Sequence, residues 1–318
     1  MTSILSNFDP ILKTYACILL GMLALAGLAL AGFTFVLRRD VRSVWVTWRA
    51  WLIMIPLVLV AIALGPVWAV AFFTLVALVG FKEFARATGL YRDWSITAAV
   101  YLGIIAVGIT CLVPDPNNGA RGWYGLFMAL PVFVIAFIVL VPVVRDKTHG
   151  QLQAMALAVL GFIYVGWMFL HVALIASHPS LIGYLLYLLF AVEVNDIAAF
   201  TFGRLLGKNG RHPFRIAISP KKTWEGALGA LAVSMILPWI MRFSFPEFGT
   251  TQLILTGLIV GVGGQLGDLG MSVIKRDIGV KDMGGAIPGH GGVLDRIDSL
   301  VYTAPLFLHM VDYYYKHW

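Results

Sequence analysis

The sequence predicts an all-α fold, a polytopic transmembrane helical bundle with about nine or ten spans. Of its 318 residues, 60% are hydrophobic and only 12% are charged, and the mean hydropathy is +0.87. Many of the apolar residues form runs approaching the roughly 20 residues that cross a bilayer, where the backbone satisfies its hydrogen bonds only as a helix. The longest hydrophilic interval, 203–225, is too short to bury a core of its own. No large soluble domain is therefore expected.

The spans are predicted from the apolar runs in chain order. These runs lie near residues 15–37, 51–64, 67–81, 95–113, 126–143, 152–176, 181–202, 226–241, 252–274 and 296–315. The first run is longer than a signal-peptide core and lacks a convincing cleavage site, so we interpret it as a retained span. The alternative count of nine arises at Gly65-Pro66, where one long helix over 50–81 could replace two short ones.

The net charge of +7 lies in short loops, which makes it a topology signal; nucleic-acid binding is not predicted. With ten spans, one side of the membrane receives every basic residue except Lys13, Arg121, Arg242 and Lys316. The positive-inside rule places that side in the cytoplasm and both termini outside. We therefore expect a multi-pass protein of the cell (inner) membrane, with the loops 203–225 and 275–293 both cytoplasmic.

The two parts of the chain differ in character. Residues 1–178 are predicted to form plain N-terminal transmembrane helices, acting as a scaffold and facing lipid. In residues 179–318, ionisable side chains lie in or beside the apolar runs, and such residues at membrane depth indicate a functional site. This C-terminal region, with its two cytoplasmic loops, is therefore predicted to perform catalysis or transport.

Two carboxylate-bearing helices flank a glycine-rich loop. Asp268, Ser272 and Lys275 are spaced i, i+4 and i+7, so they share one helix face. Asp295 and Asp298, at i and i+3, share another. The pattern predicts a cage for a hard cation such as Mg²⁺, which prefers oxygen ligands and substrate phosphates. The alternative is that these aspartates only neutralise nearby lysines and arginines.

The loops supply candidate anion-binding groups. The glycines of GGAIPGHGG, residues 284–292, allow backbone amides to approach an anion, and His290 could donate to a phosphate or move protons. The alternative is a simple turn with a solvated histidine.

In the other loop, Ser219 is predicted to cap a helix whose first turn contains Lys221 and Lys222. Two lysines there oppose the helix dipole unless an anion binds, which indicates a phosphate site. The alternative is that both lysines only follow the positive-inside rule. Asn195 and Asp196 lie near the same end of the seventh span, as polar neighbours for the cation cage or for a base and sugar.

The segment Ser272–Ser299, SVIKRDIGVKDMGGAIPGHGGVLDRIDS, resembles the signature of the phosphatidate cytidylyltransferases, also called CDP-diacylglycerol synthases. SPKKTWEG at 219–226, NDIAAFTFGRLLGK at 195–208 and GQLGDL at 264–269 are similar to other blocks of that family, and FKEFARATGL at 81–90 is family-like. The resemblance implies a nucleotidyltransferase that moves CMP from CTP to phosphatidate, giving CDP-diacylglycerol and pyrophosphate in phospholipid biosynthesis.

The resemblance also implies Mg²⁺ as cofactor, with room for a second, monovalent cation such as K⁺. The expected metal ligands are Asp268, Asp295 and Asp298. The expected catalytic residues are Asp268, Asp295, Lys275, Arg276 and His290. The residues expected to bind the nucleotide are Ser219, Lys221, Lys222, Asn195, Asp196 and Lys281.

Two other functions stay open from the sequence. A paralogous CTP-dependent enzyme could act on another lipid phosphate or on a polyprenol. An ion-coupled transporter could instead use the buried carboxylates along the ninth and tenth spans. The expected partners are CTP, phosphatidate and the lipid bilayer, and a homodimer is left open.

Overall fold

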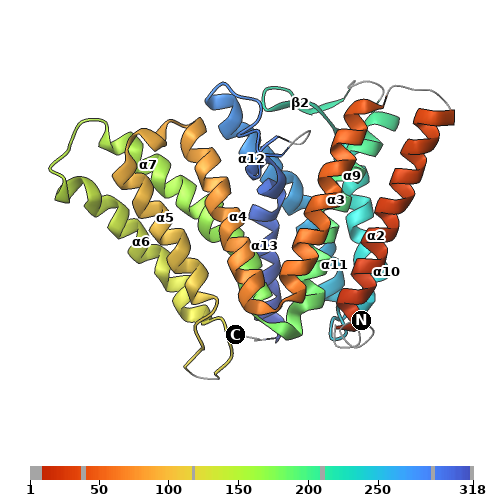
Figure 1. Cartoon of the computed structure of the whole chain (residues 1–318), viewed down its shortest axis with the longest axis horizontal. Coiled ribbons are helices and arrows are strands. Elements are labelled where there is room, and N and C mark those ends of the chain that lie inside the picture. The colour runs from red at the N-terminus through yellow and green to blue at the C-terminus, as the bar shows by residue number, and fades with distance from the viewer. Residues whose placement is uncertain (1–8, 37–40, 117–118, 208–211, 288–290, 316–318) are drawn as a thin grey trace.

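The computed structural model is a helical bundle, shown in Figure 1, and it describes residues 9–36, 41–116, 119–207, 212–287 and 291–315. The helices, in chain order, are α2 (Pro10–Ala31) continued by η1 (Gly32–Val36), α3 (Arg42–Ala63), α4 (Pro66–Ala87), α5 (Trp94–Thr110), α6 (Tyr124–Val144), α7 (Gln151–Gly161) continued by η3 (Phe162–Met168) and α8 (Phe169–Ala176), α9 (Ile182–Leu205), α10 (Trp224–Ile240), α11 (Thr250–Leu258) continued by η6 (Ile259–Gly263) and α12 (Gly264–Asp277), and α13 (Leu294–Tyr315). Short 3₁₀ turns are η2 (Leu90–Arg92), η4 (Pro179–Leu181) and η5 (Arg242–Ser244).

The predicted all-α bundle is confirmed, because each predicted apolar run has a helix or a continuous helical segment within the described residues. At Gly65-Pro66 the chain forms two helices. Gly65 has φ +103°, a left-handed conformation that favours glycine, and Pro66 opens α4 at a position where its missing N–H costs nothing. The single long helix over 50–81 is therefore not formed.

Seven helical segments are long and apolar enough to cross a membrane, judged by length and composition over the described residues. Two others, α5 and α10, are apolar but shorter. The helix α13 is not among them, and its first turn bears the charges of Asp295 and Arg296. The number of membrane spans therefore stays a prediction.

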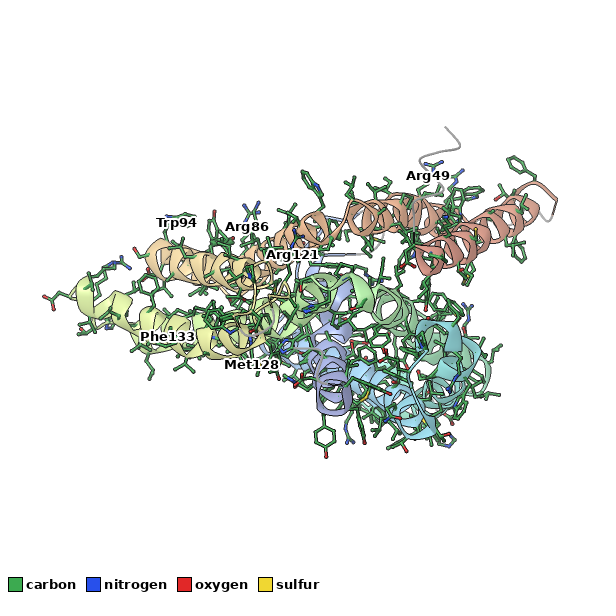
Figure 2. All side chains as sticks on the ribbon, turned by 90° about the horizontal axis from the view of Figure 1, so that it is seen from below. Arg49, Arg86, Trp94, Arg121, Met128 and Phe133 are labelled. Carbon is green, nitrogen blue, oxygen red and sulfur yellow. The ribbon has the colours of Figure 1, made fainter. Side chains whose placement is uncertain are left out.

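The helices α5 and α6 form a wing at one side of the bundle (Figure 1). Seen along the helices in Figure 2, Trp94 of α5 and Phe133 of α6 lie on opposite outer faces of this wing. Both side chains are exposed, as expected for faces that meet lipid. The buried core runs through α4, α8, α9 and α13, with large aromatic side chains such as Phe81, Phe169 and Phe307 at its centre.

One end of the bundle contains the only regular strands of the described chain, β1 (Pro213–Arg215) and β2 (Ser219–Thr223), paired antiparallel. Figure 1 places β2 and the end of α12 at the top, whereas α2 begins and α13 ends at the bottom. The loops that carry the predicted site therefore share one end of the molecule.

Candidate active site

A cavity of about 700 Å³ lies at the β2 end of the bundle, between α9, α10, α12 and α13. It is lined on several sides by charged groups that come from segments far apart in the sequence. Its charged lining residues are Glu193, Asp196, Arg204, Lys221, Lys222, Asp268, Lys275, Asp282, Asp295, Arg296 and Asp298. Because charge is expensive in a membrane bundle, this concentration makes the cavity the candidate functional site.

Asp268 of α12 faces Lys222 of β2 across the cavity. The Lys222 Nζ and Asp268 Oδ2 atoms are 2.6 Å apart, and Ser272 Oγ donates to Asp268 Oδ1 over 3.2 Å. The hydrogen bond from Ser272 confirms that Ser272 and Asp268 share one face of α12. Since the Lys222 and Asp268 side chains are 28% and 32% exposed, the pair remains open to the cavity.

Lys275 joins α12 to α13. Its Nζ donates to Asp295 Oδ1 over 3.0 Å and lies 3.7 Å from Asp298 Oδ2. Asp295 Oδ2 accepts hydrogen bonds from Met283 N at 3.0 Å and Gly292 N at 2.9 Å. Both oxygens of this buried carboxylate are therefore engaged within the protein, whereas Asp268 is more accessible.

Asp298 and Asp196 approach each other through Ser299. Asp298 Oδ1 accepts from Ser299 N at 2.8 Å, and the distance from Ser299 Oγ to Asp196 Oδ2 is 3.5 Å. Asn195 does not line the cavity; its side-chain oxygen accepts from Ser234 Oγ at 3.1 Å and links α9 to α10. Asp196 therefore lines the site, whereas Asn195 connects two helices.

The predicted helix start at Ser219 is wrong. Ser219 begins strand β2, and Lys221 and Lys222 lie in that strand, outside the first turn of α10. Thr223 caps α10 instead, accepting from Gly226 N at 3.2 Å. Both lysines still line the cavity, so the phosphate hypothesis no longer depends on the helix dipole.

Several predicted binding residues lie elsewhere. Arg276 donates to Ile218 O at 3.3 Å and to Val280 O at 3.2 Å, which ties the turn between β1 and β2 to the end of α12. Neither Arg276, Ser219 nor Lys281 lines the cavity. His290 lies outside the described residues.

Sequence reasoning left five charged residues near the site unassigned. Four of them line the cavity: Glu193, Arg204, Asp282 and Arg296. Glu83 of α4 accepts from Leu294 N, the first residue of α13, at 2.9 Å. The sequence could have indicated a functional role for Glu83, because it is an acidic residue at the end of an apolar run.

The accessible carboxylates fit a cation that arrives with its substrate. Among the described residues, no group of three or more His, Cys, Asp or Glu side chains forms a metal-binding cluster. Mg²⁺ commonly binds through one or two carboxylates and completes its shell with waters and substrate phosphates. Asp268 suits that role by its exposure, with Asp196 and Asp298 nearby in the same cavity.

The fold and the site define an integral membrane protein with a charged cavity at one end of its helical bundle. Comparison with known families identifies its class: the model of the cytidylyltransferase family matches residues 45–314. The chain belongs to this family and is a nucleotidyltransferase.

The chain is similar to individual relatives, two of which are named for this class of activity. The chain is 34% identical over 259 residues to a phosphatidate cytidylyltransferase of Staphylococcus haemolyticus, covering 81% of this chain and 93% of the relative. It is 36% identical over 207 residues to that of Staphylococcus aureus, covering 64% and 76%. It is also 33% identical over 255 residues to the uncharacterized protein YnbB of Escherichia coli, covering 78% and 81%.

Proposed function

We propose that this protein is a phosphatidate cytidylyltransferase that transfers CMP from CTP to phosphatidate, giving CDP-diacylglycerol and pyrophosphate. The observation that carries the proposal is the cavity itself. It combines lysines from β2 and α12 with carboxylates from α9, α12 and α13 at one end of a membrane bundle. A triphosphate needs cations, and a lipid phosphate needs a site at the edge of the bilayer. The relatives named for this activity support the same reaction.

In the proposed reaction, a phosphate oxygen of phosphatidate attacks the α-phosphorus of CTP in line. The bond from that phosphorus to the bridging oxygen of the β-phosphate breaks, and pyrophosphate leaves. Because the nucleophile is already an anion, no protein base is required. The residues position the two phosphates and stabilise the charge that develops on the leaving group.

Lys222 and Lys221 are the groups that would hold the CTP phosphates. Lys222 is paired with Asp268, and CTP would take over this lysine and free the carboxylate. Asp268, supported by Asp196 and Asp298, would then hold Mg²⁺, which neutralises charge on the phosphates. Lys275 is held by Asp295 and Asp298 and adds a fixed positive charge to the cavity.

The test is pyrophosphate release by purified protein supplied with CTP, Mg²⁺ and phosphatidate in mixed micelles. Release is expected only when all three are present, and a chelator should abolish it until Mg²⁺ is restored. Release with CTP and Mg²⁺ but independent of phosphatidate would contradict the proposal. So would the absence of CDP-diacylglycerol among the lipid products.

The acceptor is tested in the same assay with a panel of lipid phosphates and a polyprenyl phosphate. Phosphatidate is expected to give the highest kcat/KM. A polyprenyl phosphate that outperforms it would favour the paralogous activity. A transporter would release no pyrophosphate with any of these lipids.

A further inference from the structure

Glu83 joins the N-terminal helices to the start of α13. Its side chain lies on α4 and is buried, with 8% of the residue exposed. Its Oε2 atom accepts from Leu294 N at 2.9 Å. That amide is one of the donors at a helix start that have no acceptor within the helix, and the helix dipole favours a carboxylate there. Leu294 directly precedes Asp295, the partner of Lys275.

The same carboxylate supports both ends of the glycine-rich loop. A Cβ at Gly284 would overlap Glu83 Oε1, and a Cβ at Gly292 would overlap Glu83 Oε2. Between them, Ile287 N donates to Gly291 O at 2.9 Å. These two positions therefore require glycine because the backbone approaches the Glu83 carboxylate closely.

Asp295 holds the loop from the other side. It accepts hydrogen bonds from Met283 N and Gly292 N. Gly292 also lies against Glu83, and Met283 directly precedes Gly284, the other glycine there. Two carboxylates, one from α4 and one from α13, thus hold the backbone at residues 283–284 and at Gly292. If either were removed, the loop and the first turn of α13 would lose a fixed position.

We propose that Glu83 is a positioning residue for the catalytic cavity. It does not line the cavity, and it acts by holding Gly284, Gly292 and the start of α13, so that Asp295 and Asp298 keep Lys275 in place. The role in catalysis rests on the proposed function. The role in ordering the loop does not.

The first test measures loop opening without any substrate. Met283→Cys places a thiol at a site where the native residue is 5% exposed, in a Cys17→Ser background that removes the exposed native thiol. Because a hydrogen bond to a charged group is lost, Glu83→Ala should speed maleimide labelling of this thiol at least about tenfold. Lys82→Ala, an exposed neighbour, should leave the rate unchanged. Buried Cys111 reports the global fold and should stay unlabelled throughout.

A double-mutant cycle tests the contact itself. Gly284→Ala alone should speed labelling, because its methyl group collides with the Glu83 carboxylate. In the Glu83→Ala background the same substitution should add little, since the obstructing group is gone. Glu83→Gln keeps the size and one acceptor oxygen, so it should restore part of the protection. In the pyrophosphate assay it should likewise recover part of the kcat/KM for CTP that Glu83→Ala loses.

Two results would overturn the proposal. One is an unchanged labelling rate at position 283 in Glu83→Ala while Cys111 stays protected. The other is labelling of Cys111 in both Glu83→Ala and Glu83→Gln, which would assign Glu83 to the whole fold and not to the loop. Loss of the proposed reaction in the unsubstituted protein would leave the labelling results standing, so the two failures are distinguishable.

Discussion

At the scale of single residues, the aspartates of the site differ in what surrounds them. Asp295 has a 6% exposed side chain and both oxygens bound within the protein. Asp268 is 32% exposed and is paired with a lysine that is itself accessible. The sequence predicted both as metal ligands, from two carboxylate-bearing helices and from the family resemblance, and neither signal reveals the backbone amides of Met283 and Gly292 that bind Asp295.

The two carboxylates are therefore expected to respond differently to the same substitution. Asp268→Asn should abolish turnover with little loss of stability, because the exposed pair contributes at most about 1 kcal/mol. Asp295→Asn should also destabilise the protein by about 3 kcal/mol, because it leaves Lys275 buried without its closest partner. Pyrophosphate release and thermal unfolding in detergent measure the two effects. Full activity in Asp268→Asn would refute its role as a metal ligand.

Lys222 is predicted to act on CTP and not on folding. Lys222→Ala should raise the KM for CTP about tenfold, as expected when one charged contact to a phosphate is lost. The unfolding midpoint should change little, since the pair with Asp268 is partly exposed. Lys147→Ala, at an exposed lysine between α6 and α7, is the matched control. An equal KM effect in both variants would point to general surface charge.

At the scale of elements, the strand β2 shows where local sequence signals fail. Ser219-Pro220 has the composition of a helix start, yet the helix begins after Thr223, which can also cap it. The deciding factor is nonlocal: β2 pairs with β1, and Phe214 packs edge-on against Trp224 with ring centroids 4.4 Å apart. Strand formation depends on such partners, which a capping pattern does not reveal.

The position of β2 also depends on how closely α10 approaches α9. A Cβ at Gly226 would lie 2.6 Å from Ala199 O, so small residues allow this contact. Gly226→Ala should therefore destabilise the protein by about 1–3 kcal/mol and displace Lys222, lowering kcat/KM for CTP. Gly21→Ala is the control, because a methyl group there meets no described atom within 4 Å. Thermal unfolding and the pyrophosphate assay compare them, and equal stability in the two variants would contradict this packing.

At the scale of the whole molecule, the helices were predictable because hydropathy and chain breaks are local properties. Gly65-Pro66 is an example: a left-handed glycine followed by a proline ends one helix and begins the next. The meeting of Glu83 with Gly284 and Gly292 was not predictable in the same way. Nothing local records that α4 lies beside a loop some two hundred residues later, so the polarity of Glu83 could indicate a function but not its partner.

The arrangement of the bundle makes a final prediction about sidedness. In Figure 1 the helix α2 begins and α13 ends at the end of the bundle opposite β2, as the predicted ten crossings require. Together with the distribution of basic residues, this arrangement predicts that the cavity faces the cytoplasm. The loop near Lys147 should then face the cytoplasm and the loop near Arg121 the opposite side. Both side chains are exposed.

The measurement uses Lys147→Cys and Arg121→Cys, each in the Cys17→Ser background, with a maleimide that does not cross membranes. Lys147→Cys should label in inside-out vesicles and Arg121→Cys in right-side-out ones. Detergent should make both accessible, which controls for thiol reactivity. Labelling of both from the same side would mean that α6 does not cross the bilayer. The reverse pattern would place the charged cavity away from cytoplasmic CTP, and the proposed reaction could not proceed there.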